Sequence, residues 1–308
     1  MAMTRQRLGD DALRISFSNV TKRYGAVTAL DKFSADVAPG RITAFLGANG
    51  SGKTTSMRLL LGLADPTAGT ALVGGRTYHE LAHPLRTVGA VLDQGFQPNR
   101  SARNHLGIVA AQAGVPAGRV DDVLELVGLT EAATRRVGKF SLGMRQRLAL
   151  ASAVIGDPSV LVLDEPFNGL DPQGIQTLRV FLRNFADRGG TVFLSSHLLA
   201  EIANSADDAI IIDHGRLVSA GPIADLIPAT ARTVVTTRNA DILAAALQVT
   251  HATVERSGTD RLTVTNVSTE VIGRAALDAG AVILGMRAEG DDLEAIFENL
   301  IHPKELVS

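Results

Sequence analysis

Several residue types are missing or scarce in this chain of 308 residues, and each absence removes a class of structure. Cysteine is absent, which excludes a disulfide framework, a thiolate metal site and a cysteine nucleophile. Tryptophan is also absent, and the chain has only 2 tyrosines, so we expect little aromatic packing. The 30 basic and 32 acidic residues nearly cancel, which argues against nucleic-acid wrapping and a polybasic membrane anchor. Any binding partner must therefore be recognised by a local surface patch and not by the net charge of the chain.

Long hydrophobic runs are missing as well. The most apolar stretch, Leu148 to Ile155, lies between Arg147 and Asp157 and is too short to span a bilayer. Asp10 and Asp11 stand where a secretory signal needs its apolar core. We therefore expect neither a cleaved signal nor a membrane span.

Hydrophobic residues nevertheless make up 45% of the chain, enough for one large domain and a smaller one. Short apolar runs bounded by glycine or proline alternate with helical patterns, which predicts an α/β fold with a parallel core sheet. The expected strands are Arg14–Phe17, Phe33–Val37, Ile42–Leu46, Val88–Leu92, Val160–Leu163, Thr191–Leu194 and Ala209–Ile212.

Two regions differ from this pattern. Residues 100–139 show helical periodicity without a strand, which predicts an inserted helical subdomain over about 100–150. After Pro228 the order of elements becomes βαββαβα, which suggests a ferredoxin-like appendage over 228–308, with the main domain at 1–227. From Ala229 onward the tail has 7 basic and 11 acidic residues, so it is not a nucleic-acid arm. Its expected elements are strand Thr233–Thr237, helix Ala240–Leu247, strands near Ala252–Arg256 and Leu262–Thr265, helix Glu270–Ala279, strand Ala281–Met286 and helix Asp291–Leu300.

A phosphate-binding motif follows the strand at Ile42–Leu46. Residues Gly47–Thr54 match G-x-x-x-x-G-K-[ST] between a strand and a helix, the context that the motif requires. In such a loop the backbone N–H groups surround the phosphates of ATP, Lys53 reaches the β and γ phosphates, and the Thr54 hydroxyl ligates Mg²⁺. A glycine-rich turn without a ligand is the alternative, which the later motifs disfavour. The predicted nucleotide-binding residues here are Gly47, Asn49, Gly50, Ser51, Gly52, Lys53, Thr54 and Thr55.

A second motif is the apolar strand Val160–Leu163, which ends in two acidic residues. A buried strand places Asp164 beside the phosphates, where its carboxylate can hold the magnesium shell. Glu165 can then take a proton from the attacking water. Alone, this pattern is more typical of a strand that meets a solvated turn. The phosphate-binding loop upstream favours the catalytic interpretation.

Between these motifs the sequence resembles the ATP-binding subunits of ABC transporters. Their LSGGQ signature corresponds to Phe140–Met144, which retains Ser141 and Gly143 and replaces the last glutamine with methionine. The resemblance covers roughly residues 14–227. It implies a P-loop NTPase core of ABC type with an antiparallel β subdomain and a helical insert, followed here by a small C-terminal α+β appendage.

The resemblance implies roles for three further residues. Tyr24 corresponds to the aromatic residue that stacks on adenine, Asp171 belongs to the D-loop that touches the opposite subunit, and His197 corresponds to the γ-phosphate sensor. Each also has a simpler interpretation: an exposed strand tyrosine, a helix cap after a turn, and a surface histidine. Together with Lys53 and Glu165, His197 completes the implied catalytic set.

One position departs from the family. The Q-loop glutamine that contacts magnesium and the membrane subunit should follow the strand Val88–Leu92, where Asp93 and then Gln94 stand. Either could serve, since an aspartate is a good oxygen ligand for Mg²⁺. Alternatively, Asp93 only caps the turn before Gly95. The implied metal ligands are Thr54, Asp164 and Asp93.

The resemblance implies an ATPase that needs ATP and Mg²⁺ and drives a separate transmembrane permease from the inner face of the cell membrane. Two copies, or one copy and a homologous ATPase subunit, meet head to tail, so that Ser141 and Gly143 of one chain close over the nucleotide on Lys53 of the other. Nucleic acid is not an expected partner. The segment Ser141–Arg147 and the tail segment Asp292–Phe297 look like the bacterial drug and antibiotic-peptide export branch.

Two alternatives belong to other classes. A soluble ABC-type ATPase that remodels a macromolecular complex carries two cassettes or a long coiled coil, and no sustained heptads occur between Lys53 and Ser141. A non-hydrolysing regulatory nucleotide-binding module is disfavoured because Glu165 and His197 are both present. The residues alone leave the transported substrate open.

Overall fold

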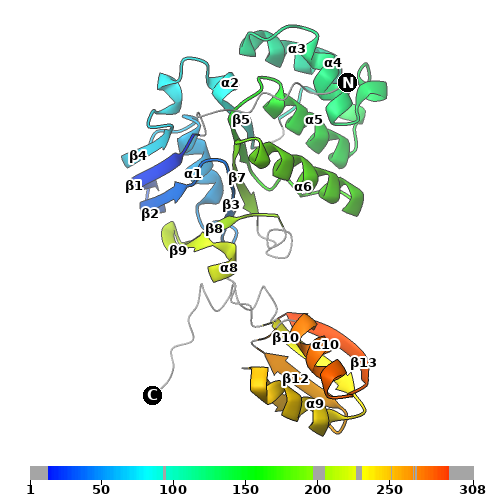
Figure 1. Ribbon diagram of the computed structural model, residues 1–308. Helices are drawn as coiled ribbons and strands as arrows, with labels where there is room; N and C mark the ends of the chain where they lie inside the picture. Colours follow the sequence, from blue (N-terminus) through cyan, green and yellow to red (C-terminus); the bar gives the residue numbers. More distant parts are fainter. Residues whose placement is uncertain are drawn as a thin grey trace. The chain divides into compact units, whose positions relative to one another are not determined.

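The computed structural model describes residues 13–92, 95–196, 205–226, 231–250, 252–265, 267 and 269–290. The chain divides into two compact units between Ile223 and Ala224. Figure 1 shows the first unit in blue to yellow-green and the second in yellow to red. Among the described residues no helix is both long and apolar enough to cross a membrane.

A six-stranded sheet forms the centre of the first unit, in the order β5-β6-β7-β3-β8-β9. The first five strands run parallel, as the sequence predicts. The edge strand β9 is antiparallel to β8 and was not predicted. It follows β8 through a tight turn at His214 and Gly215, whose φ values of 44° and 75° suit a two-residue hairpin. The strands are β3 (Ile42–Leu46), β5 (Val88–Val91), β6 (Val160–Leu163), β7 (Thr191–Ser196), β8 (Asp208–Asp213) and β9 (Arg216–Pro222).

An antiparallel sheet of three strands, in the order β2-β1-β4, lies beside this central sheet. Strands β1 and β2 are longer than the sequence pattern indicates, and β4 was not predicted because only its last residues are buried. This sheet confirms the antiparallel β subdomain that the family resemblance implies. Its strands are β1 (Ile15–Tyr24), β2 (Val27–Val37) and β4 (Ala68–Val73).

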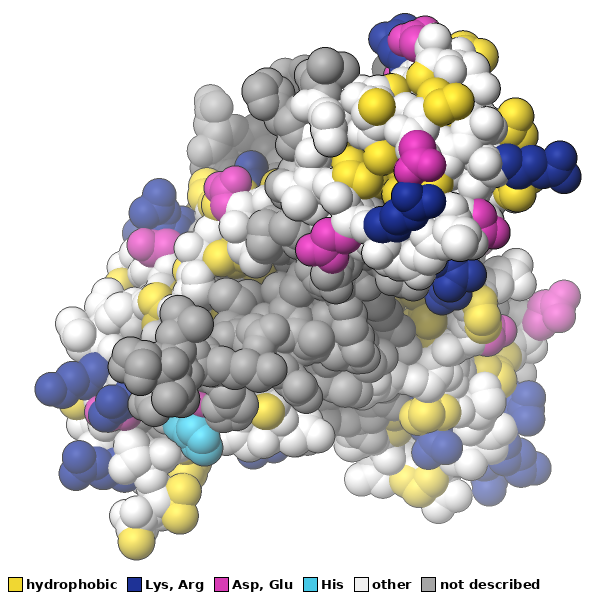
Figure 2. Space-filling view, turned by 90° about the horizontal axis from the view of Figure 1, so that it is seen from below, with side chains coloured by type: hydrophobic (Ala, Val, Ile, Leu, Met, Phe, Trp, Pro, Cys, Tyr) yellow, Lys and Arg dark blue, Asp and Glu magenta, His cyan; other side chains and the backbone are white. Residues whose placement is uncertain are grey.

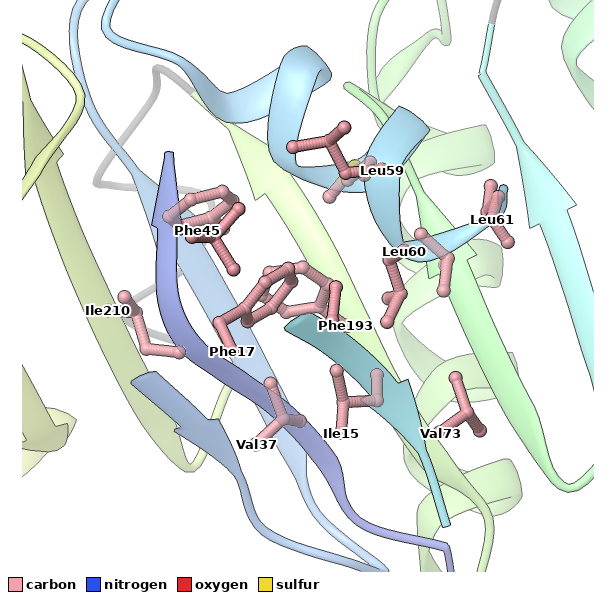
Figure 3. Close-up of a cluster of buried hydrophobic side chains, with 14 of the residues drawn as sticks. Ile15, Phe17, Val37, Phe45, Leu59, Leu60, Leu61, Val73, Phe193 and Ile210 are labelled. Carbon is pink, nitrogen blue, oxygen red and sulfur yellow. The ribbon is translucent and has the colours of Figure 1, made fainter. Parts of the chain in front are cut away.

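The main hydrophobic core lies between these two sheets and helix α1 (Lys53–Leu60) (Figure 3). Four phenylalanine rings form a continuous contact path, with centroid distances of 5.3 Å for Phe17–Phe33, 5.7 Å for Phe33–Phe45 and 5.1 Å for Phe45–Phe193. Aromatic packing is thus concentrated here, although aromatic residues are scarce in the chain. The core anchors β3 and α1, the two elements on either side of the phosphate-binding loop.

Helices cover the other side of the central sheet and extend beyond it (Figure 1). Helix α5 packs on β5, and α6 packs on β7 and β3. Helices α3 and α4 pack on each other and on α5. The helices of the first unit are η1 (Tyr78–Glu80), α2 (Pro84–Thr87), α3 (Ala102–Ala113), α4 (Arg119–Leu126), η2 (Thr130–Ala132), η3 (Val137–Lys139), α5 (Leu142–Val154) and α6 (Pro172–Asp187), and α8 (Ile223–Leu226) spans the division between the units.

The second unit has the element order βαββαβ and an antiparallel sheet in the order β11-β12-β10-β13, the element order of ferredoxin-like domains. Val235, Leu243, Leu262, Val264 and Ile272 are among its buried core residues. The helix expected at residues 291–300 lies outside the described residues. The elements are β10 (Ala231–Thr237), α9 (Ala240–Leu247), η4 (Gln248–Thr250), β11 (Thr253–Arg256), β12 (Arg261–Thr265), α10 (Thr269–Asp278) and β13 (Ile283–Gly290).

Charged side chains of both signs lie on the face of the molecule seen in Figure 2. The described basic and acidic side chains are scattered there among hydrophobic ones. This distribution agrees with the near-zero net charge of the sequence.

Candidate functional site

The phosphate-binding loop joins the fully buried strand β3 to helix α1. Gly52 precedes the helix with a φ of 115°, a conformation that side chains other than glycine rarely adopt. A Cβ atom on Gly47 would lie 2.4 Å from both the Ile212 carbonyl and the Ser51 hydroxyl. Glycine at these two positions is therefore required for the chain to turn tightly against its neighbours.

Lys53 begins helix α1 and is almost completely buried, at 6% exposure. Its Nζ atom donates to the carbonyl oxygens of Gly47 at 2.6 Å and Ala48 at 3.2 Å. Burial lowers the pKa of Lys53, and the nearby carboxylates of Glu165 and Asp164 act in the opposite direction. The loop thus encloses the positively charged ammonium group of Lys53.

One hydrogen bond connects helix α1 to the end of strand β6, and two more connect the end of β6 to strand β7. The Thr54 hydroxyl donates to Asp164 Oδ2 at 2.7 Å, and the Ser195 hydroxyl donates to Asp164 Oδ1. The Glu165 N–H in turn donates to Ser195 Oγ at 2.9 Å. Leu163 of β6 lies opposite Leu194 of the neighbouring strand β7. The residues that follow them, Asp164 and Ser195, are therefore side by side.

The structure therefore brings together Lys53, Thr54, Asp164 and Glu165, which the sequence motifs single out separately. The sequence analysis missed the role of Ser195, whose hydroxyl holds Asp164 and accepts from the backbone of Glu165. A buried serine at the end of a core strand was the available signal, but only the order of strands in the sheet shows its partner.

Glu165 has a backbone φ of 48°, in the left-handed region that non-glycine residues seldom occupy. Such a conformation costs on the order of 1 kcal/mol and is typical of functional sites. The chain is held in place one residue before Glu165, because the Asp164 N–H donates to the Val91 carbonyl at 2.7 Å. The turn at Glu165 thus changes the chain direction immediately after the buried strand.

Ser141 caps the N-terminus of helix α5, where its hydroxyl accepts from the Met144 N–H at 3.2 Å. One turn further, the buried Gln146 side chain donates to the Pro166 carbonyl at 2.8 Å. This bond ties the signature helix to the residue after Glu165. The sequence analysis did not single out Gln146, since glutamine in an arginine-rich helix is usually exposed.

Asp171 caps helix α6 and accepts from the Gly174 N–H at 2.8 Å. The preceding Gly169 has a φ of 76°, and a Cβ atom there would lie 2.2 Å from Leu142 Cδ2. The D-loop and the signature segment of one chain therefore touch. Both segments line a cavity of about 770 Å³ between α5 and α6.

Tyr24 ends strand β1 and is 49% exposed. The Lys22 ammonium lies 4.9 Å from the centre of its ring, and its strand partner is Val27. These described contacts do not link Tyr24 to the phosphate-binding loop. Two predicted site residues, His197 and Asp93, lie outside the described residues, as does Gln94.

The buried strand β3, the glycine-rich loop and the buried Lys53 at the start of α1, with two carboxylates directly after β6, define a P-loop protein that hydrolyses a nucleotide. The family model described as "ABC transporter" matches residues 30–168. Together with the relatives described next, this match shows that the chain belongs to the ABC transporter family and is an ABC-type ATPase.

Two curated relatives cover about two thirds of the chain. The bacitracin transport ATP-binding protein BcrA of Bacillus licheniformis is 42% identical over 68% of this chain and 69% of that protein. The Nod factor export ATP-binding protein I of Paraburkholderia xenovorans is 37% identical over 69% and 72% of the two chains. Among solved structures, an ATP-binding subunit of an ABC transporter matches the fold with a TM-score of 0.63 and 24% identity, over 69% of this chain and 91% of the other.

Proposed function

We propose that this chain powers the export of a small molecule or peptide through a separate membrane permease, by ATP-driven closure of two ATPase subunits. The names of the two relatives support transport of an antibiotic or another secreted product. The permease, the export direction and a position on the inner face of the membrane are parts of this proposal. The hydrogen-bond network around Asp164 is the observation that supports ATP hydrolysis, the central step of this proposal.

The network connects the groups that ATP hydrolysis needs. Thr54 from the phosphate-binding helix and Ser195 from strand β7 hold both oxygens of Asp164, and Ser195 also accepts from the Glu165 backbone. The network thus links the phosphate-binding helix to the peptide that carries Glu165. We assign Glu165 as the general base that takes a proton from the attacking water.

The residues present also fit ATP and Mg²⁺. The Ser51 hydroxyl is buried and has no hydrogen-bond partner among the described residues, as expected for a group that faces phosphate. Thr54 and Asp164 supply hard oxygen ligands, and Mg²⁺ usually takes few protein ligands besides phosphate and water. When bound, the metal neutralises charge on the transferred phosphoryl group. Lys53 supplies the positive charge for the phosphates.

Head-to-tail pairing is the second part of the mechanism. Ser141 and Gly143 lie at the N-terminus of the 13-residue helix α5, where unpaired N–H groups and the helix dipole favour an anion. We propose that they approach the γ phosphate of the opposite chain, and that Asp171 and the D-loop contact that chain as well. His197, Tyr24 and either Asp93 or Gln94 retain the roles that the family implies.

Glu165→Gln tests this function. The amide cannot accept the proton, so turnover should fall by about 10²- to 10⁴-fold while ATP binding is retained. ATP with Mg²⁺ should then trap a dimer, which size-exclusion chromatography with light scattering detects. Glu131→Gln, at an exposed glutamate of η2, is the matched control and should hydrolyse ATP normally. Hydrolysis by Glu165→Gln at the unmodified rate would contradict the assignment.

A further inference from the structure

Positive charge is concentrated in the loop that precedes helix α5. Between Glu131 and Asp157 the chain has no acidic residue, and its basic residues there are Arg135, Arg136, Lys139, Arg145 and Arg147. The first three of these, which lie in the loop itself, are exposed. The charge is therefore local, in a chain whose net charge is only −2.

Backbone contacts attach this loop to the segment before α3, which adds a further cation. The Val137 N–H donates to the Arg100 carbonyl at 2.9 Å, and Ser101 and Arg136 form an antiparallel bridge. The loop and the start of α3 thus form one surface. We define the basic patch as Arg100, Arg135, Arg136 and Lys139.

Carboxylates do not neutralise the basic patch. In the same helical region Arg103 pairs with Asp121 at 2.6 Å. Within the described part of the chain, by contrast, no ion pair involves a residue of the basic patch. Arg135 donates to the Lys139 carbonyl at 2.9 Å, a contact that leaves its charge uncompensated. The patch is therefore free to attract negative charge from outside the chain.

The loop offers no apolar centre for a protein partner. Its apolar residues Ala133, Val137 and Phe140 are buried, at 3%, 1% and 3% exposure. Its exposed positions are Thr134, Arg135, Arg136, Gly138 and Lys139. Protein interfaces usually have a buried core that is apolar and poor in charge. A hydrated group of cations on an exposed loop is better suited to a plane of negative charge.

We propose that the basic patch binds the anionic headgroups of membrane lipids. This inference rests on the proposed function, which places the chain on the inner face of the membrane beside a permease. Anionic lipids give that face a negative surface potential, and each Lys or Arg near it strengthens binding about fivefold. The patch thus helps to turn the helical region toward the membrane, where several headgroup phosphates can be contacted at once.

Vesicle sedimentation of the full-length chain without nucleotide tests this proposal. Vesicles of one part phosphatidylglycerol to two parts phosphatidylcholine should bind the chain, and added salt should release it. Vesicles of phosphatidylcholine alone should not bind it, and equal binding to both kinds would overturn the proposal. Inorganic phosphate should release no more chain than sodium chloride of equal ionic strength. A larger release would indicate a site for one phosphate ion and would also overturn it.

Two double variants locate the binding surface. Arg135→Gln/Arg136→Gln should bind the mixed vesicles roughly tenfold or more weakly, through the loss of two cations. Arg274→Gln/Arg287→Gln is the matched control, since it removes the same charge from exposed arginines of the second unit and should bind normally. Equal losses in both would show an effect of net charge alone, which would contradict a role of the basic patch.

A lysine variant separates a lipid surface from an acidic protein segment. Arg135→Lys/Arg136→Lys keeps both charges, so it should bind the mixed vesicles as the unmodified chain does. A loss as large as that of the glutamine variant would indicate recognition of the guanidinium groups, as at a protein carboxylate, and would overturn the inference. Binding to polyglutamate but not to the mixed vesicles would do the same. Neither outcome affects the Glu165→Gln test, because vesicle binding is measured without ATP.

Discussion

At the residue scale, Lys53 combines burial with positive charge. The loop carbonyls of Gly47 and Ala48 and the carboxylates of Asp164 and Glu165 stabilise its ammonium group against the cost of desolvation. A buried cation surrounded by backbone turns is suited to phosphate, which brings charge of the opposite sign. Removal of the ammonium group should therefore weaken ATP binding in the first place, and not only slow hydrolysis.

Lys53→Ala should weaken ATP binding roughly tenfold to a hundredfold, because a hydrogen bond to a charged group contributes about 1.5–3 kcal/mol. Isothermal titration calorimetry of the full-length chain measures the change. Lys139→Ala removes an exposed lysine of η3 and serves as the control. Near-normal affinity in Lys53→Ala would count against the phosphate-binding interpretation of the loop.

At the scale of elements, a partly buried histidine joins two helices of the helical region. His105 on α3 lies 3.1 Å from the Ser152 hydroxyl on α5, and the Phe96 ring packs edge-on against it with a centroid distance of 5.0 Å. Burial is the main cause that lowers the pKa of His105, and the charge of Arg100 adds to it. The packing of the two helices therefore favours the neutral form of this imidazole.

This packing predicts a pH dependence of stability. Because the folded pKa of His105 lies below the unfolded value of about 6.5, its contribution is fully present above that value and is lost as pH falls through the folded pKa. Urea unfolding at pH 7.5 and 5.5 should show a smaller loss for His105→Gln than for the unmodified chain. His79→Gln, at an exposed histidine, should keep the full loss. Identical losses in both variants would contradict the role of His105.

At the scale of the whole molecule, one chain holds only half of each proposed catalytic site. Ser141→Arg places a bulky cation where the signature must approach the opposite nucleotide, so hydrolysis should fail while ATP binding persists. The substitution also removes an N-cap, worth about 1 kcal/mol. Ser101→Arg removes the equivalent cap of α3, where Ser101 accepts from Asn104 at 3.2 Å, and should leave hydrolysis intact.

A mixture of Ser141→Arg and Lys53→Ala chains tests the shared site directly. In a head-to-tail dimer both lesions fall on one site, so a mixed dimer keeps one intact site. Equal amounts should recover about a quarter of the unmodified ATPase rate when sites act independently, since half of the dimers are mixed. A dilute, monomeric Ser141→Arg preparation that hydrolyses ATP normally would show that the signature acts within its own chain or not at all.

The sequence by itself determined the elements whose cause is local. Periodicity identified the buried strands of the central sheet, and the spacing of Gly47 to Thr54 identified the phosphate-binding loop, because a strand, a tight turn and a helix need no distant partner to be specified. Strand β9 escaped notice because an edge strand with exposed residues lacks a strong period. The same weak signal hid β4.

Only the tertiary structure decided which groups act together. Ser195 contacts Asp164 because β7 lies beside β6, and Gln146 reaches Pro166 because α5 packs against the end of that sheet. Residues 20 to 31 positions apart meet through strand order and helix packing, which local patterns do not contain.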